Sequence, residues 1–267
     1  MINTDFHVHC NFSGDASASM ESMVAAAVEK GFKQIAFTDH IDFSPTGEKL
    51  YYIDYDEYLI EFNRIKDKYA GKIELVFGIE MGLEPQIAHV INDFISKYPF
   101  EFVIGSSHST EMKEHFSEDF FQGKDKKTAH AMYFEEVYKN VTTINCFDCY
   151  GHLDYISRYG PYEDKSLNYW DHDEIIDEIL MELISDGKGI EINTSALRYG
   201  LDSPYPCFDI LKAYKDFGGE IITIGSDAHE PKNLGWQFDK ARDVLLNAGF
   251  EYYTVFKNRK PKFIRIN

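Results

Sequence analysis

The chain has 267 residues, of which 44% are hydrophobic and 15% aromatic, and its formal net charge is −18. This apolar content is typical of a globular protein and excludes a largely disordered one. The negative charge argues against a nucleic-acid backbone as the main partner, because such binding depends on clustered Lys and Arg residues. It leaves room for a small anionic substrate, since bound metal ions can reverse the local field.

Neither a membrane segment nor a secretion signal is evident. No apolar run approaches the ~20 residues that span a bilayer, and no basic, apolar leader precedes the first strand, which is expected to begin at Ile2. Cys146 and Cys149 form a CxxC motif that has no second pair or nearby His to complete a zinc site. We therefore expect buried, reduced thiols in a cytoplasmic protein without a membrane partner.

Strand-like apolar runs alternate with helical segments along the whole chain. In chain order we expect strand 2–9, helix 17–31, strand 34–38, helix 54–70, strand 73–79, a helix opened by Pro85, strand 101–106, a long connection over 109–127, helix 129–142, strand 147–152, helix 171–186, strand 189–193, helix 207–217, strand 220–226, helix 232–248 and two short strands at 252–256 and 262–266. Such strands are typical of a parallel sheet covered by helices. No linker divides the chain, so residues 1–267 are predicted to form a single α/β domain, a closed βα barrel. The main alternative, a doubly wound sheet, often opens with a glycine-rich phosphate loop that is absent here.

Histidines gather where the predicted strands end. Six of the ten lie in the blocks DFHVHC, FTDH, SSHS, GHLD and GSDAH, and a glutamate, Glu80, follows the third strand. The carboxyl ends of barrel strands converge on one face, where barrel active sites are built. Side chains two apart on a strand share a face. His7 and His9 are therefore expected to point to the same side, and so are Asp227 and His229. Imidazoles and carboxylates gathered in this manner predict a site for several divalent metal ions.

These blocks also carry a resemblance. In this order, DFHVHC, FTDH, GIE, SSH, GHLD and GSDAH resemble the motifs of the PHP (polymerase and histidinol phosphatase) superfamily, from Asp5 to about Pro231. The length and the final GSDAHEP are similar to those of its histidinol-phosphate phosphatases. The resemblance implies a distorted (β/α)7 TIM-like barrel that carries three divalent metal ions, for which the ligands permit Zn, Mn or Fe.

The resemblance also implies a ligand set. One metal would be bound by His7, His9, Glu80 and Asp227, a second by Glu80, His108 and His152, and a third by Asp15, His40 and His229. Glu80 would bridge the first two metals, and Glu80, Asp227 and His229 are the predicted catalytic residues. Many relatives have histidine where this chain has Asp15, whose carboxylate can bind the same ions with a different preference. Cys10, where many relatives have Ser or Thr, is expected to pack rather than to bind metal.

Other polar residues near the strand ends have less specific interpretations. Arg158 and Arg198 are predicted to bind a phosphate, which a guanidinium can contact through two hydrogen bonds, although a surface ion pair explains either one equally well. Glu191 and Asn193 could orient a metal-bound water or a ligand histidine. Asp39, Asp42 and Asp154 could hydrogen-bond a ligand imidazole or receive a substrate amine. We expect structural roles for His89, His130 and His172, and either a structural role or a substrate contact for His115.

The predicted activity is metal-dependent hydrolysis of a small phosphate monoester by a hydroxide that bridges two metals. The third ion and the arginines would neutralise the phosphoryl oxygens. The resemblance implies that the substrate is L-histidinol phosphate, hydrolysed to L-histidinol and phosphate in histidine biosynthesis. The alternatives are another PHP-type phosphoesterase acting on nucleotides or small phosphate esters, a metal-dependent amidohydrolase, and a metal-binding module without activity. The scarcity of basic and stacking clusters near the loops disfavours long nucleic acids, and the oligomeric state is left open.

Overall fold

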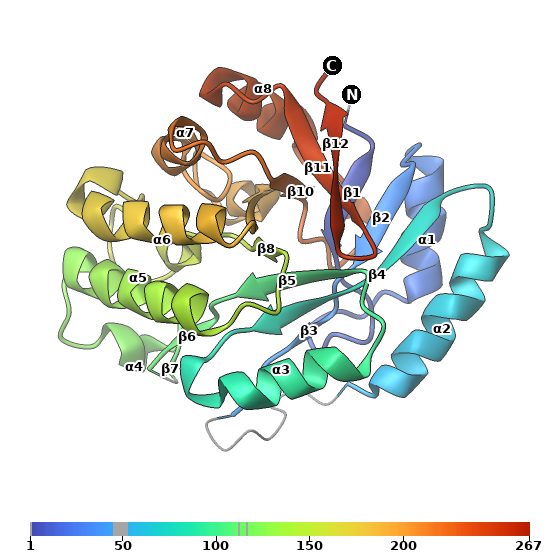
Figure 1. Ribbon diagram of the computed structural model, residues 1–267, viewed down its shortest axis with the longest axis horizontal. Coiled ribbons are helices and arrows are strands. Elements are labelled where there is room, and N and C mark those ends of the chain that lie inside the picture. Colours follow the sequence, from blue (N-terminus) through green and yellow to red (C-terminus); the bar gives the residue numbers. More distant parts are fainter. Residues whose placement is uncertain (1, 45–52, 112, 116) are drawn as a thin grey trace.

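Parallel strands arranged around a central axis form the core of the molecule (Figure 1). The computed structural model describes residues 2–44, 53–111, 113–115 and 117–267. Neighbouring strands in the sheet follow the order β1 (Thr4–Val8), β2 (Gln34–Phe37), β4 (Glu74–Gly82), β5 (Phe102–Ser106), β8 (Cys149–Tyr150), β9 (Gly189–Asn193) and β10 (Ile222–Gly225). A two-residue strand, β3 (His40–Ile41), extends the β2 side of β4. All these pairings are parallel, as the continuous hydrophobic strands predicted.

The first and last strands of this sheet meet and nearly close it. Val8 and Ala228 form a parallel bridge, in which the N–H of His9 donates to the carbonyl of Ala228 at 2.9 Å and the N–H of Ala228 donates to that of His7 at 3.3 Å. The fold is therefore the predicted distorted (β/α)7 barrel.

Helices cover the outside of the barrel (Figure 1). They are α1 (Met20–Glu29), α2 (Tyr55–Lys68), α3 (Ala88–Lys97), α5 (Lys126–Thr143), α6 (Asp173–Ser185), α7 (Phe208–Asp216) and α8 (Phe238–Ala248). Each overlaps a predicted helix, although α8 begins at Phe238 and not at the predicted residue 232. Helix α1 begins later than predicted because the Ser19 hydroxyl accepts from the N–H of Ser22, which caps the helix at that point. Among the described residues, no helix is both long and apolar enough to cross a membrane.

Short elements occupy the connections. The predicted long connection contains β6 (Ser109–Thr110), β7 (Lys113–Glu114) and α4 (Glu118–Phe121), and 3₁₀ turns occur at η1 (Pro85–Ile87), η2 (Tyr155–Arg158), η3 (Tyr169–Asp171), η4 (Thr194–Tyr199) and η5 (Pro231–Asn233). The helix that Pro85 was expected to open therefore begins as a 3₁₀ turn.

An antiparallel hairpin covers the amino-terminal end of the barrel. Strands β11 (Tyr252–Lys257) and β12 (Lys260–Arg265) pair with each other, as the two short terminal strands predicted. The hydroxyl of Thr254 accepts from the N–H of Ile222, and the ring of Phe256 lies 5.0 Å from that of Phe102. Ile222 and Phe102 begin their strands, so this end of the barrel is filled by apolar side chains.

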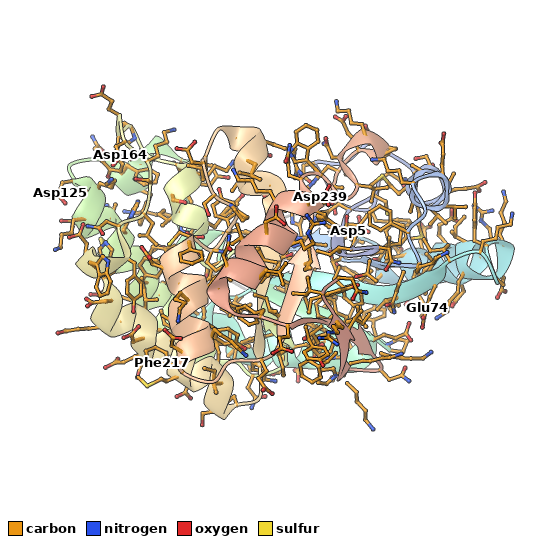
Figure 2. All side chains as sticks on the ribbon, turned by 90° about the horizontal axis from the view of Figure 1, so that it is seen from above. Asp5, Glu74, Asp125, Asp164, Phe217 and Asp239 are labelled. Atoms are coloured by element: carbon orange, nitrogen blue, oxygen red, sulfur yellow. The ribbon has the colours of Figure 1, made fainter. Side chains whose placement is uncertain are left out.

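Acidic side chains are spread mostly over the surface. Asp125, Asp164 and Asp239 are exposed, and the first two lie at the periphery of the view in Figure 2. Asp5, in contrast, is 0% exposed and lies among the strands. A carboxylate that has lost its hydration requires compensating hydrogen bonds inside the protein.

Candidate metal centre

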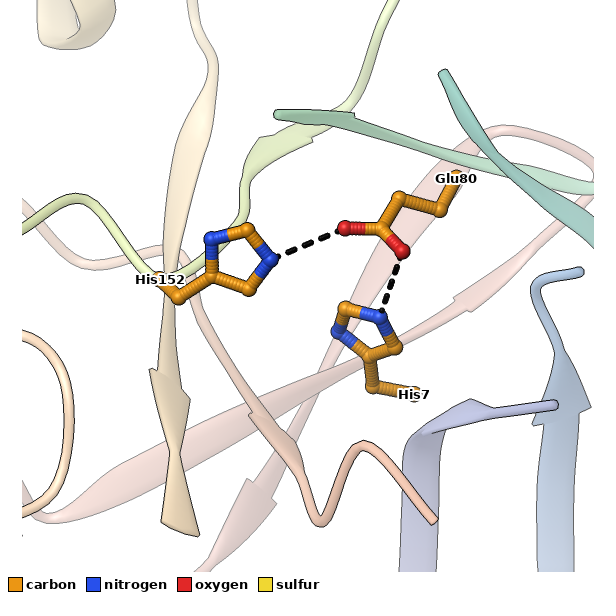
Figure 3. A group of neighbouring side chains, drawn as sticks. All are labelled: His7, Glu80 and His152. Atoms are coloured by element: carbon orange, nitrogen blue, oxygen red, sulfur yellow. Dashed lines mark hydrogen bonds and ion pairs between the residues drawn. The ribbon is translucent and has the colours of Figure 1, made fainter. Parts of the chain in front are cut away.

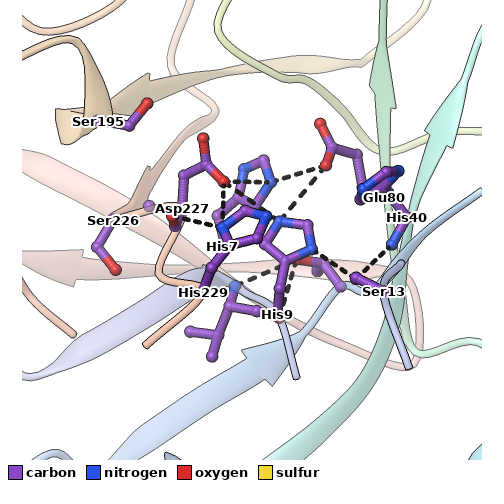
Figure 4. A network of polar contacts seen from close by, with 12 residues as sticks. His7, His9, Ser13, His40, Glu80, Ser195, Ser226, Asp227 and His229 are labelled. Carbon is purple, nitrogen blue, oxygen red and sulfur yellow. Dashed lines mark hydrogen bonds and ion pairs between the residues drawn. The ribbon is translucent and has the colours of Figure 1, made fainter. Parts of the chain in front are cut away.

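The carboxyl ends of the parallel strands bring all the predicted metal ligands to one end of the barrel. Figure 4 shows His7, His9, His40, Glu80, Asp227 and His229 among them. The β3–β4 register places His40 beside Glu80. His108, His152 and Asp227 each follow their strand by two residues. These positions are remote in sequence, and the barrel makes them neighbours.

Glu80 lies at the centre of the group (Figure 3). Its Oε2 is 3.1 Å from Nε2 of His7, and its Oε1 is 2.9 Å from Nε2 of His152 and 3.2 Å from Nε2 of His108. The carboxylate is thus shared between two sets of imidazoles, as a bridging ligand requires. Burial alone would raise the pKa of Glu80, but His7 and His108 outweigh it and hold that pKa well below its usual range.

Asp227 and His9 complete the group on one side of Glu80. Nε2 of His9 lies 3.3 Å from Oδ1 of Asp227 and 3.5 Å from Oε2 of Glu80. One ligand atom each from His7, His9 and Asp227 lie within 4.8 Å of one another. As predicted, the rings of His7 and His9 share a face, with centroids 5.0 Å apart.

A further group contains Asp15. Its Oδ1 lies 3.2 Å from Nε2 of His40, and its Oδ2 lies 3.1 Å from Nε2 of His229. The aspartate therefore contacts both imidazoles with which the sequence analysis grouped it. Burial would raise the pKa of Asp15, but the hydrogen bonds from His229 and His40 hold it well below its usual range.

Asp42 contacts two of the ligand imidazoles at Nδ1, the ring nitrogen that faces away from the cluster. Its Oδ2 lies 3.0 Å from Nδ1 of His40, and its Oδ1 lies 2.9 Å from Nδ1 of His108. Both rings are thereby oriented with Nε2 toward the cluster. Only a glycine fits at position 82, because a Cβ there would lie 2.1 Å from Oδ1 of Asp42. The expectation that Asp42 could bond a ligand imidazole is confirmed.

Glu191 orients His7 in the same way. Its Oε1 lies 2.7 Å from Nδ1 of His7, while its Oε2 accepts from Nδ2 of Asn193 at 3.0 Å and from the backbone N–H of His152 at 3.0 Å. The sequence analysis named Glu191 and Asn193 for this role.

Asp39 supports the site through an intermediate residue. It accepts hydrogen bonds from the N–H and Oγ of Ser13, at 2.9 and 2.8 Å, and Ser13 Oγ lies 3.0 Å from Nδ1 of His9. The thiol of Cys10 also donates to Asp39, at 3.1 Å, which supports a packing role for this cysteine. Asp154 accepts from the N–H of Cys207 at 2.9 Å. Sequence reasoning missed Ser13, and only its spacing of four residues from His9 hinted at the contact.

The ligand groups open into a cavity of about 920 Å³. Arg158 and Arg198 line it together with Tyr155, Tyr159, Tyr199, Glu84, Lys113 and Asp119. The Arg158 guanidinium lies 3.3 Å from the ring centroid of Tyr199, and Arg198 donates to the carbonyls of Ser226 and Asp227 at 2.6 and 2.7 Å. Neither arginine pairs with a carboxylate within the described part of the chain. The surface ion pairs considered as alternatives do not form there.

The remaining histidines are not among the candidate metal ligands. His89 is exposed on α3, whereas His130 and His172 are buried near the starts of α5 and α6, with ring centroids 6.0 Å apart. His115 is 1% exposed, and its Nε2 lies 2.8 Å from the hydroxyl of Thr110. These surroundings are those of structural residues.

Comparison with known proteins agrees with this arrangement. Residues 5–195 match the model of the PHP domain family. The chain belongs to this family. It is 34% identical over 264 residues to the histidinol-phosphatase of Lactococcus lactis subsp. lactis, covering 97% of this chain and 96% of the relative. A probable histidinol-phosphatase of Clostridium acetobutylicum is 28% identical, with coverage of 97% and 98%.

Solved structures show the same PHP domain fold. The crystal structure of the L. lactis histidinol phosphate phosphatase, complexed with Zn, L-histidinol and phosphate, matches with a TM-score of 0.89 and 33% identity, covering 97% of this chain and 98% of that one. A putative histidinol phosphatase from Listeria monocytogenes matches with a TM-score of 0.75 at 20% identity, covering 88% and 98%.

The donor set of this PHP domain fits divalent cations. Nε2 of His9 is buried without a hydrogen-bond partner among the described residues, although two carboxylates lie close to it. Burial would lower the pKa of His40, but the hydrogen bonds with Asp15 and Asp42 raise it, on balance, to about 10. The imidazole of His40 therefore retains a proton that a bound cation would displace.

Proposed function

We propose that this protein is a metal-dependent phosphomonoesterase that hydrolyses L-histidinol phosphate to L-histidinol and phosphate, a reaction of histidine biosynthesis. The observation that carries the proposal is the meeting of carboxylate-linked histidine groups and two arginines in one cavity. The L. lactis relative, whose structure contains Zn, L-histidinol and phosphate, supports the same substrate for this chain.

Three divalent cations are proposed at this site. One would be held by His7, His9, Glu80 and Asp227, a second by Glu80, His108 and His152, and a third by Asp15, His40 and His229. Divalent cations supply Lewis acidity, which acidifies water at neutral pH and offsets negative charge on phosphoryl oxygens.

Some side chains around the cavity bind the substrate, and others orient the metal ligands. Arg158 and Arg198 provide the positive charge for the phosphoryl group. Tyr199 stacks on Arg158 and fixes the plane of its guanidinium. Asp42 and Glu191 hold the ligand imidazoles in one orientation, so that little rearrangement is needed when substrate binds.

The cavity also suits the cationic part of the proposed substrate. Glu84 and Asp119 line it on the β4 and α4 sides. Glu84 is 4% exposed, and burial raises its pKa to about 7 although it accepts a hydrogen bond from Ser109. Acidic side chains here favour an amine or imidazole over a second phosphate, which makes an amino-alcohol phosphate a better fit than a nucleotide polyphosphate.

A panel of phosphate esters tests the proposal. The full-length, metal-loaded protein should release phosphate from histidinol phosphate with a much higher kcat/KM than from a nucleotide monophosphate or p-nitrophenyl phosphate. Equal rates on all three would remove the named substrate while leaving the phosphatase class, and release from the nucleotide alone would favour the alternative.

Glu80→Gln tests the metal centre itself. It should lower kcat/KM by about a hundredfold or more, with little change in the far-ultraviolet circular dichroism. The control is Glu220→Gln, which should retain parental activity. Glu220 is exposed and precedes the amino-terminal end of β10, whereas the metal ligands follow its carboxyl end.

A further inference from the structure

Asp227 and His229 lie on a segment with little regular structure of its own. This ligand segment, residues 226–235, runs from the end of β10 to the approach of α8, and its regular structure is limited to the isolated bridge at Ala228 and the short turn η5. Asp227 has a φ of 52°, in the left-handed region that is costly for a residue with a side chain. Contacts with the rest of the protein must therefore hold the segment in place.

The carboxylate of Asp5 holds both ends of the ligand segment. Oδ1 accepts from the N–H of Ser226 at 3.0 Å, while Oδ2 accepts from the N–H of Gly235 at 3.0 Å and from the Ser226 hydroxyl. Asp5 is fully buried on β1, two residues before His7. A buried carboxylate bonded to two N–H groups fixes the separation between them.

The ammonium of Lys30 holds the middle of the same segment. It lies at the carboxyl end of α1, and its Nζ donates to the carbonyl oxygens of Pro231, Lys232 and Leu234, each at 3.0 Å. A lysine has three N–H donors, and all three are used here. Lys30 is nevertheless an exposed residue, so these bonds are made at the outer surface.

Asp5 and Lys30 come from the same part of the chain as the candidate ligands that face Asp227 and His229. Asp5 and Lys30 belong to β1 and α1, and His7, His9 and Asp15 lie on the same β1–α1 unit. Asp227 shares a candidate group with His7 and His9, and His229 shares one with Asp15. The Val8–Ala228 bridge and the bonds from Arg198 to the carbonyls of Ser226 and Asp227 hold the start of the segment. The bonds from Asp5 and Lys30 add its far end and its middle, and so help to fix the distance between the two halves of each group.

We propose that Asp5 and Lys30 are positioning residues that together hold the ligand segment, and thereby place Asp227 and His229 against the ligands of the β1–α1 unit. Both side chains act on the segment, mainly through its backbone, and neither bonds a ligand side chain. The proposal rests on the metal-dependent function proposed above.

Lys30→Met is the decisive variant, because an exposed side chain can be replaced without opening the core. Lys33→Met, three residues further along and also exposed, is the matched control. Two readouts are used on the full-length purified protein: hydrogen exchange of peptides covering residues 226–235, and the rate of zinc loss to a chelator. We expect Lys30→Met to raise both by about tenfold or more, Lys33→Met to change neither, and Lys30→Arg, which keeps the charge, to fall between.

Asp5→Asn keeps the shape but turns one acceptor oxygen into a donor that faces other donors. It should raise segment exchange at least as much as Lys30→Met does. The proposal would be overturned if hydrogen exchange and zinc loss in Lys30→Met equalled those of the parent. It would also be overturned if the variant had a lower melting temperature with both rates unchanged, because Lys30 would then contribute only to general stability. A parent protein that binds no metal would overturn the proposed function instead, and the exchange comparison would still decide the role of Lys30.

Discussion

Nδ1 of His7 lies 2.7 Å from Oε1 of Glu191, and this contact turns the opposite nitrogen of the ring toward Glu80. The contact joins the first strand of the barrel to β9, which supplies no metal ligand of its own. A residue of this kind decides which nitrogen carries the proton and hence which one is free to bind a cation.

Glu191→Gln is therefore expected to weaken the site without unfolding it. The amide can present its N–H₂ to Nδ1 of His7, which would place the ring proton on Nε2, the atom that faces Glu80. We expect kcat/KM and metal affinity to fall about 10- to 100-fold, as measured by steady-state kinetics and by metal analysis after dialysis. Parental metal content and parental activity would together contradict this role.

Asp15→Ala should remove one metal and spare the others. Asp15 joins His40 to His229, and its side chain is 57% exposed, so its loss leaves no buried void. Metal analysis should find one equivalent fewer than in the parent protein. Asp15→His should restore that equivalent because an imidazole can bind the same ions. An unchanged metal content in the alanine variant would show that Asp15 binds no cation.

Arg158→Met should weaken phosphate binding specifically. A charge-assisted hydrogen bond is worth about 1.5–3 kcal/mol, which corresponds to roughly 10- to 100-fold in kcat/KM. The inhibition constant for inorganic phosphate should rise by a similar factor. Arg158→Lys should recover only part of the loss, since an ammonium cannot reproduce the planar stack on Tyr199. Equal phosphate inhibition in all three proteins would assign Arg158 to structure alone.

The buried His130, which lies outside the metal centre, should make the free energy of unfolding depend on pH. Burial, with a smaller contribution from His172, lowers the pKa of His130 from 6.5 to about 4. Between these values the unfolded chain binds the proton and the folded protein does not. The free energy of unfolding should therefore fall as the pH falls from about 6.5 to about 4, by on the order of 1–3 kcal/mol.

His130→Leu should remove that part of the slope. Urea unfolding at several pH values measures it as the difference between variant and parent, in which the contribution of the metal ligands cancels. His89→Leu, at an exposed position on α3, is the control and should leave the slope unchanged. A variant slope equal to that of the parent would show that His130 takes up its proton in the folded protein.

The barrel and the ligand group could be predicted because both follow from local patterns. Continuous apolar runs mark buried parallel strands, and the strand ends of a barrel must converge, so His7, Glu80 and Asp227 could be grouped before any coordinates were known. The strand around Cys149 was predicted too long, since only two of its residues pair as a strand. Apolar composition marks burial, and it does not mark where the backbone ladder ends.

The contacts that support the ligands could not be predicted from patterns in the same way. Lys30 bonds carbonyls about 200 residues further along the chain, and Asp5 bonds Ser226 at a similar separation. Backbone acceptors leave no mark in the sequence, so a lysine that bonds three of them looks like any surface lysine. Asp39 was likewise expected near an imidazole, but it reaches His9 only through Ser13. Tertiary packing selects such partners, and residue type alone does not.

The β11–β12 hairpin has a consequence for how the protein is made. Its Thr254 and Phe256 seal the barrel at the end opposite the metal ligands. On the ribosome, therefore, a nascent chain can carry every metal ligand and still leave the bottom of its core open to water. The final stage of folding must wait until β12 has emerged from the exit tunnel, so the lower barrel is where chaperones would find exposed apolar surface.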